Sequence, residues 1–278
     1  MDTLEKVRGQ HGIVGRQQEL EALFACLSAG RHVLLEGPVA VGKTALARAC
    51  AEVLERGVLR VDGDGRFTEQ KLVGQFDPPV VMREGYHAGA FLRGPLVQAM
   101  EQGSILFINE LNRMPEGVQN VLLPVLDEGS LVVPHLGQLR AAPGFSVIAT
   151  MNPREFVATG HLSEALLDRF ELIQLRHQSE AEELEIVLRH TRPPTPDRAL
   201  AEEAVAIVRR TRQHPRIRRG ASVRAAIALV EVARALGGIE ALSRAAQVAL
   251  PGRIELREAQ EGVMEGVLLE VAPEKKKR

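Results

Sequence analysis

The segment from Gly37 to Thr44 carries the residues best suited to chemistry. It reads GPVAVGKT and matches the full pattern G-x-x-x-x-G-K-T, with strand-like HVLLE before it and helix-like ALARACAEVLE after it. In that context, loop amides at a helix N-terminus cradle phosphates, while Lys43 neutralises them and Thr44 offers its hydroxyl to Mg²⁺. The pattern therefore favours a nucleotide site over an ordinary strand-to-helix turn. The predicted nucleotide-binding residues are Gly37, Pro38, Val39, Ala40, Val41, Gly42, Lys43, Thr44 and Ala45.

The segment ILFINE, residues 105–110, is the natural second half of such a site. A metal bound to a triphosphate needs an acceptor at the tip of a neighbouring strand, and aspartate is the usual residue there. Asn109 occupies this position, so we predict metal contacts from Thr44 and Asn109. A neutral amide weakens the grip on a metal-bound water by about 1 to 2 kcal/mol. Glu110 can deprotonate the attacking water, and the alternative is that it only caps the following segment.

Strand-like and helix-like segments alternate through the first part of the chain. Continuously apolar runs are typical of strands that helices cover on both faces, so we predict an α/β fold with a mostly parallel, helix-covered sheet. Pro95 suits the first turn of a helix. The expected strands are 32–36, 58–64, 104–109, 145–152 and 171–175, with a strand-like segment at 80–82 and a hairpin at 131–144.

After residue 175 the pattern becomes helical. Ser179 and Glu182 form a capping box, and Asp197 is a candidate cap for the next helix. Further helices are expected over about 222–236 and 240–250, with a less certain one near the end. We predict a core domain at 1–177 and a small all-helical lid domain at 178–278, which ends in a basic tail.

Composition is that of a folded globular protein. Hydrophobic residues make up 45% and charged residues 26% of the 278 positions, and the net charge is −1. No stretch is long and apolar enough to cross a bilayer and no apolar leader is evident, so a cytoplasmic location without membrane insertion is expected. Cys26 and Cys50 are expected to be buried thiols rather than a disulfide. The histidines show no ligand spacing for zinc.

Ordered motifs give a family resemblance from about Gly12 to about Leu236. Their order is similar to that of the MoxR family of AAA+ ATPases, relatives of the ATP-hydrolysing subunit of magnesium chelatase. That resemblance implies a P-loop AAA+ core with a helical lid, and ATP and Mg²⁺ as cofactors. The motifs are GPVAVGKTALARA, GAFLRGPL, LFINELNR, VIATMNPREF, LSEALLDRFE and RRGASVRAAIAL.

The resemblance also implies roles for three polar residues. Asn152 resembles the first sensor, which holds the attacking water or γ-phosphate. Arg169 resembles the arginine finger that acts on an adjacent subunit, and Arg224 resembles the second sensor on the lid. A guanidinium suits both arginine roles because it stays charged and spreads its donors over phosphate oxygens. The alternatives are a turn at Asn152 and surface charges at Arg169 and Arg224.

A finger acting in trans implies a ring, usually a hexamer, with ATP between subunits. Family members often remodel or mature a client complex together with a von Willebrand factor A domain protein. Residues 80–91 resemble the helix-2 insert of this clade, and 131–139 the hairpin before the first sensor. In related rings these elements face the pore or a partner, and the alternative is a plain surface hairpin.

Three functions compete at this point. The first is a slow or partner-stimulated ring ATPase, because Lys43, Thr44 and Glu110 are kept although Asn109 departs from the family pattern. The second is a nucleotide-gated assembly switch with negligible hydrolysis. The third is a nucleic-acid motor, suggested by the basic stretch 209–220. Nucleic acid is disfavoured, because the chain has no Trp and one Tyr and so lacks stacking platforms. Asn109→Asp is expected to tighten Mg²⁺ binding.

Overall fold

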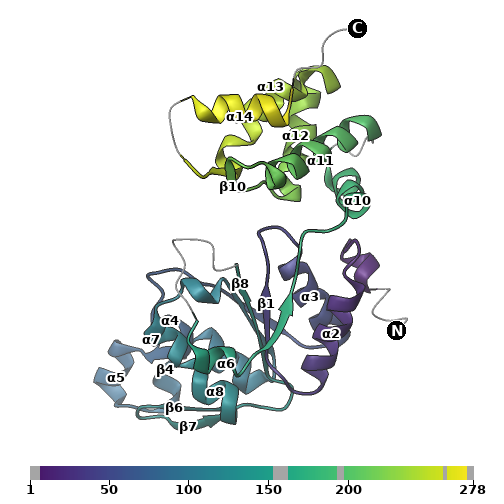
Figure 1. The fold of residues 1–278 in the computed structure, drawn as a ribbon. Coiled ribbons are helices and arrows are strands. Elements are labelled where there is room, and N and C mark those ends of the chain that lie inside the picture. Colours follow the sequence, from purple (N-terminus) through teal and green to yellow (C-terminus); the bar gives the residue numbers. More distant parts are fainter. Residues whose placement is uncertain (1–6, 153–161, 193–196, 259–261, 274–278) are drawn as a thin grey trace. The chain divides into compact units, whose positions relative to one another are not determined.

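The computed structural model describes residues 7–152, 162–192, 197–258 and 262–273 (Figure 1). The basic tail at 274–278 lies outside them. The chain forms two compact units, one of Met1–Pro38 with Gly42–Leu175 and one of Val39–Val41 with Arg176–Arg278. None of the helices in the described part is long and apolar enough to cross a membrane.

A parallel five-stranded sheet forms the centre of the first unit, which confirms the predicted fold class. The strand order is β2-β5-β8-β1-β9, and every neighbouring pair is parallel. The carboxyl ends of all five strands therefore meet at one edge of the sheet. The strands are β1 (Val33–Glu36), β2 (Val58–Asp62), β5 (Ile105–Asn109), β8 (Ser146–Met151) and β9 (Glu171–Gln174).

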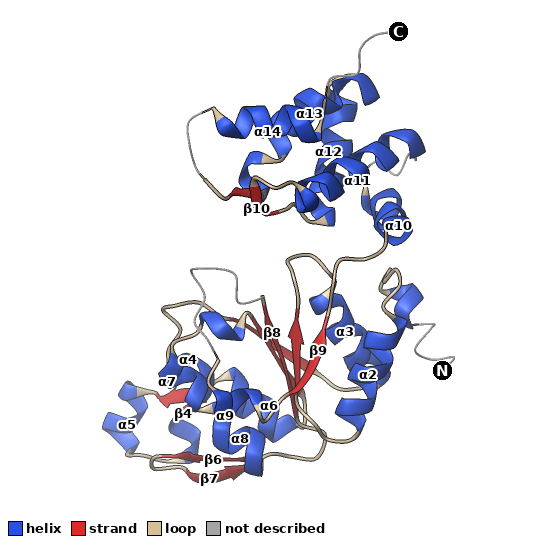
Figure 2. Ribbon diagram, viewed as in Figure 1, coloured by secondary structure: helices blue, strands red, loops and turns tan. Residues whose placement is uncertain are grey.

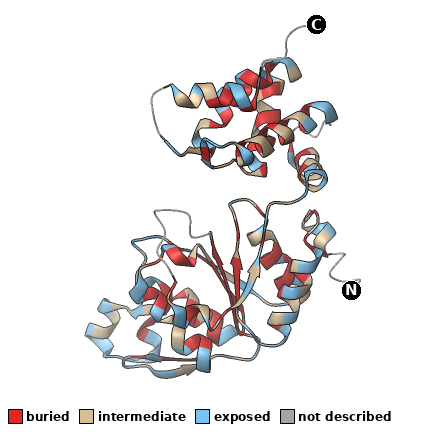
Figure 3. Cartoon of the chain, viewed as in Figure 1, coloured by how far each residue is buried: buried red, intermediate tan, exposed pale blue. Residues whose placement is uncertain are grey.

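Helices cover both faces of this sheet (Figure 2). Helices α2 and α3 lie on one side, and α4, α6, α7 and α8 lie on the other. The central strands β5 and β8 are buried along almost their whole length, as their apolar sequences predict (Figure 3). The helices are α2 (Gln17–Ser28), α3 (Lys43–Val53), α4 (Glu69–Val73), α6 (Pro95–Gln102), α7 (Glu116–Asn120), α8 (Leu122–Glu128) and α9 (Glu164–Leu167), with the short 3-10 helices η1 (Ala88–Ala90) and η2 (Leu111–Arg113).

His32, directly before β1, is held neutral in the folded state. Its Nδ1 accepts a hydrogen bond from the backbone N–H of Val147 at 3.0 Å, and its ring meets Phe145 edge-on. Burial, with a smaller contribution from the positive charge of Arg31, lowers the pKa of His32 from 6.5 to about 4. A proton on Nδ1 would also remove the acceptor for Val147.

His32 predicts a defined loss of stability in acid. Because its pKa is lower in the folded than in the unfolded state, its stabilising contribution is complete above pH 6.5 and is lost as the pH falls from 6.5 to about 4. Urea unfolding of His32→Gln should therefore vary less with pH across this window than unfolding of the wild type. His87→Gln, which changes an exposed histidine, serves as the control. Identical pH profiles for wild type and His32→Gln would contradict the prediction.

An insert between α4 and α6 corrects one expectation from the sequence. Strands β3 (Gly74–Phe76) and β4 (Phe91–Arg93) pair antiparallel, and the helix α5 (Pro78–Glu84) lies between them. The segment 80–82, predicted to be strand-like, belongs to this helix. Asp77 and the following prolines explain the difference, because proline favours a first helical turn and the amides of Val80 and Val81 bond to the Asp77 carbonyl.

The hairpin predicted at 131–144 is confirmed as β6 (Ser130–Val133) paired with β7 (Gly137–Arg140). Aromatic contacts join its turn to the insert. The Tyr86 ring stacks on the His135 ring at 4.0 Å between centroids, and Phe76 meets both rings edge-on. The insert and the hairpin are therefore one packed surface element rather than two separate loops.

The second unit is mainly helical. The predicted capping box of Ser179 and Glu182 is present, and Asp197 accepts a hydrogen bond from the Leu200 amide. One short strand pair, β10 (Ile217–Arg219) with β11 (Glu255–Leu256), was not expected. The helices are α10 (Glu180–His190), α11 (Arg198–Gln213), α12 (Val223–Ala235), α13 (Leu242–Ala249) and α14 (Val263–Val271), with the 3-10 helices η3 (Ile239–Ala241) and η4 (Pro251–Arg253).

Both cysteines are free thiols. Cys50 is buried, as predicted, whereas Cys26 is partly exposed. Burial raises the pKa of the Cys50 thiol to about 12, so it remains protonated at neutral pH and is a poor nucleophile.

Candidate nucleotide-binding site

The loop between β1 and α3 has the form of a phosphate cradle. Gly42, at the N-cap of α3, adopts φ 97°, and a Cβ added there would meet no atom within 4 Å. Gly37, at the other end, packs against the residue that follows β9, because a Cβ there would lie 2.5 Å from the Leu175 carbonyl oxygen. The open glycine and the first turn of α3 suit a bound phosphate. All nine residues predicted to bind nucleotide lie on this loop and the start of α3.

Lys43 joins the loop to the end of β8. Its Nζ donates to the carbonyl oxygens of Gly37 at 2.5 Å and Pro38 at 2.9 Å, and to Asn152 Oδ1 at 3.1 Å. The predicted phosphate ligand and the predicted first sensor are therefore in direct contact. Thr44 is partly exposed on the first turn of α3. A lysine, a hydroxyl and open loop amides form a donor set that fits a nucleoside triphosphate with Mg²⁺.

Glu110 continues this chain of contacts. Its Oε1 accepts from Asn152 Nδ2 at 3.2 Å, and its Oε2 accepts from Arg113 Nη1 at 2.7 Å. Lys43, Asn152 and Glu110 are thus connected by side-chain hydrogen bonds. Although Glu110 precedes η2, its side chain makes no capping bond there, which argues against the capping alternative.

The backbone of Glu110 is strained. It adopts φ 57° and ψ 51°, the left-handed region that costs a non-glycine residue about 1 kcal/mol or more. Its N–H donates to Thr150 Oγ1 on β8 at 2.9 Å, and this bond holds the conformation. Strain of this kind gathers at functional sites, where it aims a side chain.

Asn109 lies between two strands. Its Oδ1 accepts from Thr150 Oγ1 of β8 at 3.0 Å, and its Nδ2 donates to Asp62 Oδ1 of β2 at 2.9 Å. Asp62 also pairs with Arg60, and that contact, together with Asn109, lowers the pKa of the Asp62 carboxyl. Sequence reasoning missed Asp62, Arg113 and Thr150. The only available signal for Asp62 was an acidic residue at the end of a predicted strand.

Arg169 makes its polar contacts elsewhere. Its Nη2 donates to Asp127 Oδ2 at 2.6 Å, and its Nη1 donates to the Ala165 carbonyl at 2.7 Å. Within the described residues it makes no contact with Lys43 or Glu110.

Comparison with known families supports this geometry. The AAA domain (dynein-related subfamily) matches residues 32–170, half of the chain. The matched segment contains the loop, the Asn109–Glu110 pair and Arg169. The chain belongs to this AAA family.

Relatives with similar sequences occur in Bacillus and Staphylococcus. YeaC of Bacillus subtilis is 32% identical over 250 residues, which covers 80% of this chain and 74% of YeaC. SERP0979 of Staphylococcus epidermidis is 34% identical over 160 residues, and the match covers 57% of this chain and 59% of that protein. Neither name states an activity, so these relatives carry no functional assignment.

Solved structures share the AAA fold at low sequence identity. A candidate ATPase from Cytophaga hutchinsonii has a TM-score of 0.54 at 22% identity and covers 99% of this chain and 96% of its own. RuvB of Thermotoga maritima has a TM-score of 0.56 at 19% identity, covering 85% and 71%. NtrX of Brucella abortus, solved in complex with ADP, has a TM-score of 0.55 at 18% identity, covering 82% and 52%.

Arg224 stands in the second unit of this AAA chain, near the start of α12. It is exposed, and its side chain has no hydrogen bond or ion pair to any residue that the structure describes. An exposed guanidinium with no partner among the described residues can bind an external anion. The role of second sensor stays a prediction.

The arginines of the basic stretch 209–220 are ion-paired within the second unit. They make these ion pairs with glutamates from neighbouring elements. Glu183 is buried, so two of these pairs are internal structure rather than free surface charge. The pairs are Arg209 and Arg212 with Glu183, Arg210 with Glu203, Arg216 with Glu270, and Arg218 and Arg219 with Glu255.

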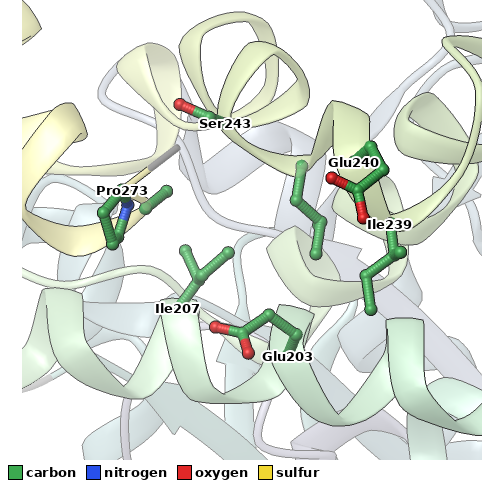
Figure 4. A pocket seen from close by; sticks show the side chains of 8 residues that line it. Glu203, Ile207, Ile239, Glu240, Ser243 and Pro273 are labelled. Carbon is green, nitrogen blue, oxygen red and sulfur yellow. The ribbon is translucent and has the colours of Figure 1, made fainter. Parts of the chain in front are cut away.

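A small pocket in the second unit is too small for a nucleotide. Glu203, Ile207, Glu240 and Ser243 are among its lining residues (Figure 4). Its volume is about 20 Å³, enough for about one water molecule. A cavity of this size cannot hold a nucleotide or another ligand of that size.

Proposed function

We propose that the protein is a MoxR-type AAA+ ATPase that binds ATP with Mg²⁺ and hydrolyses it slowly or on stimulation by a partner. The connected contacts of Lys43, Asn152 and Glu110, directly behind the phosphate loop, carry this proposal. They bring a phosphate ligand, a polar positioning group and a general base to one edge of the sheet. The ADP bound by NtrX, which has a similar fold, supports an adenine nucleotide.

Each residue has a defined part in this function. Lys43 and the loop amides bind the phosphates, while Thr44 and Asn109 would hold Mg²⁺, which supplies charge neutralisation when bound. Glu110 takes the proton of the attacking water, and Asn152 orients that water. Each carboxylate oxygen of Glu110 accepts one hydrogen bond and keeps a second lone pair, which can accept a proton from the attacking water. The neutral amide of Asn109, where aspartate is usual, supports slow or stimulated turnover.

Assembly and clients are the finer part of the proposal. Arg169 acts as a finger on the next subunit of a cytoplasmic hexameric ring, and the helical domain at 178–278 is a lid whose Arg224 senses the phosphates. The joined surface of the insert and the hairpin contacts a client complex, with a von Willebrand factor A domain protein as partner. A neighbouring reading frame that encodes such a domain would support this assignment.

Nucleotide binding through Lys43 is the first test. Lys43→Ala should weaken the affinity for a fluorescent ATP analogue by about 10- to 100-fold, because it removes a charged donor to the phosphates. Equilibrium titration measures this, with Lys71→Ala, an exposed lysine on α4, as the control. Equal affinities for wild type and Lys43→Ala would remove the loop as the binding site.

Two other functions remain distinguishable. An assembly switch, in which ATP binding builds the ring with negligible hydrolysis, is favoured by the neutral amide of Asn109 at the predicted metal position. A nucleic-acid motor has less support, because the arginines of 209–219 are paired with glutamates. Stimulation of hydrolysis by DNA, with a steep dependence of binding on salt, would revive it.

A further inference from the structure

The Asn109 amide has two ends of nearly the same shape and opposite hydrogen-bonding character. Its Oδ1 only accepts and its Nδ2 only donates, so a half-turn of the amide exchanges an acceptor for a donor with little steric change. A residue that holds a metal-bound water needs the acceptor on the metal side. The hydrogen-bond partners of the amide therefore determine whether Asn109 can present an acceptor oxygen to a metal-bound water, as an aspartate would.

Thr150 alone does not determine the orientation of the Asn109 amide. Its Oγ1 accepts from the Glu110 N–H at 2.9 Å and donates its hydrogen to Asn109 Oδ1 at 3.0 Å. A hydroxyl has one hydrogen and two lone pairs. Had the amide turned, Thr150 could accept from Nδ2 instead, so it tolerates both orientations.

Asp62 is compatible with only one orientation of the Asn109 amide. An ionised carboxylate has no hydrogen to give, so Asp62 Oδ1 can face Nδ2 at 2.9 Å but not the carbonyl oxygen of Asn109. The strand order determines which way the Asn109 oxygen then faces. β5 lies between β2 and β8, and β8 lies between β5 and β1, which the phosphate loop follows. With Nδ2 held toward β2, Oδ1 faces β8 and the side of the sheet that carries the phosphate loop.

We propose that Asp62 is a positioning residue that fixes the Asn109 amide with its oxygen toward the nucleotide side. This proposal rests on the proposed function, since the amide oxygen has a role on that side only if Mg²⁺ takes part in nucleotide binding. The contact with Asp62 also explains why the usual aspartate cannot replace Asn109 unless Asp62 changes as well. In Asn109→Asp two carboxylates would meet where the amide now donates to Asp62, and like charges at that distance repel. The expectation that Asn109→Asp tightens Mg²⁺ binding therefore holds only when Asp62 changes too.

The test measures how much Mg²⁺ increases affinity for a fluorescent, non-hydrolysable ATP analogue. Asp62→Ala should reduce this Mg²⁺-dependent gain about tenfold, the value of one hydrogen bond to a charged group, and leave the affinity in EDTA unchanged. Asn109→Asp alone should lose a similar part of the gain. The exchanged pair, Asp62→Asn with Asn109→Asp, should recover it, because one donor and one acceptor face each other again.

A second readout needs no nucleotide. In the apo protein, Asn109→Asp should lower the unfolding temperature, and the exchanged pair should restore it. Asp64→Asn is the control, because Asp64 bonds to the Arg66 amide of its own turn and carries the same charge two residues away. An unchanged Mg²⁺-dependent gain in Asp62→Ala, or additive effects of the two exchanges on unfolding, would overturn the positioning role. A wild type that binds no adenine nucleotide would overturn the proposed function, while the unfolding measurement would still decide the Asp62–Asn109 pairing.

Discussion

Glu110→Gln will bind ATP with the affinity of the wild type and hydrolyse it at least about 100-fold more slowly. Glutamine keeps the size of the side chain and can still meet Asn152, but it cannot take a proton from water. It also weakens the charged contact with Arg113, whose guanidinium lies 2.7 Å from Oε2. Because the contact with Arg113 becomes weaker rather than stronger, a loss of rate is caused by the loss of the base and not by tighter binding of the side chain to Arg113.

Single-turnover hydrolysis of radiolabelled ATP, at enzyme in excess, measures this effect apart from product release. Glu116→Gln is the matched control, because Glu116 is exposed on the first turn of α7 and contacts none of the predicted site residues in the described structure. Equal rates for wild type and Glu110→Gln would favour the assembly switch, in which ATP binding alone does the work.

Most of the residues at the carboxyl edge of the sheet, beside the loop from Gly37 to Thr44, could be predicted from the sequence because their sequence patterns are local. Continuous apolar runs gave the buried strands, and the loop from Gly37 to Thr44 carries its pattern within one turn of chain. The placement of Asn109 at the end of β5 followed from the same reasoning. Such features depend on neighbours in sequence, which a single chain reveals.

The missed features depend on register between distant segments. Asp62 meets Asn109 only because β2 and β5 pair in parallel with these residues opposite each other. Asp127 meets Arg169 across 42 positions. The helix α5 was not predicted for another reason, because Val80 and Val81 are β-branched and favour a strand while the prolines before them favour a helix start. Pairwise contacts of this kind have no trace in composition or periodicity.

Arg169→Ala will lower steady-state ATP turnover by about 1000-fold if Arg169 is a finger, the lower end of the range for such arginines. Its fold should survive, because the pair with Asp127 is partly exposed and is worth at most about 1 kcal/mol. Arg31→Ala removes a comparable exposed pair, with Glu171, and serves as the control. The rate of each variant is measured at several protein concentrations.

Mixing decides whether Arg169 acts in its own chain or in the next one. Within the described chain it contacts Asp127 and Ala165 and not Glu110, so action in trans requires that it leave Asp127 for a neighbouring subunit. Mixing Arg169→Ala with Lys43→Ala should then restore part of the ATPase activity that each variant lacks alone, because a Lys43→Ala subunit still supplies its arginine to the intact site of an Arg169→Ala neighbour. No recovery of activity in the mixture would place the effect of Arg169 within one chain and remove the main support for a ring with shared sites.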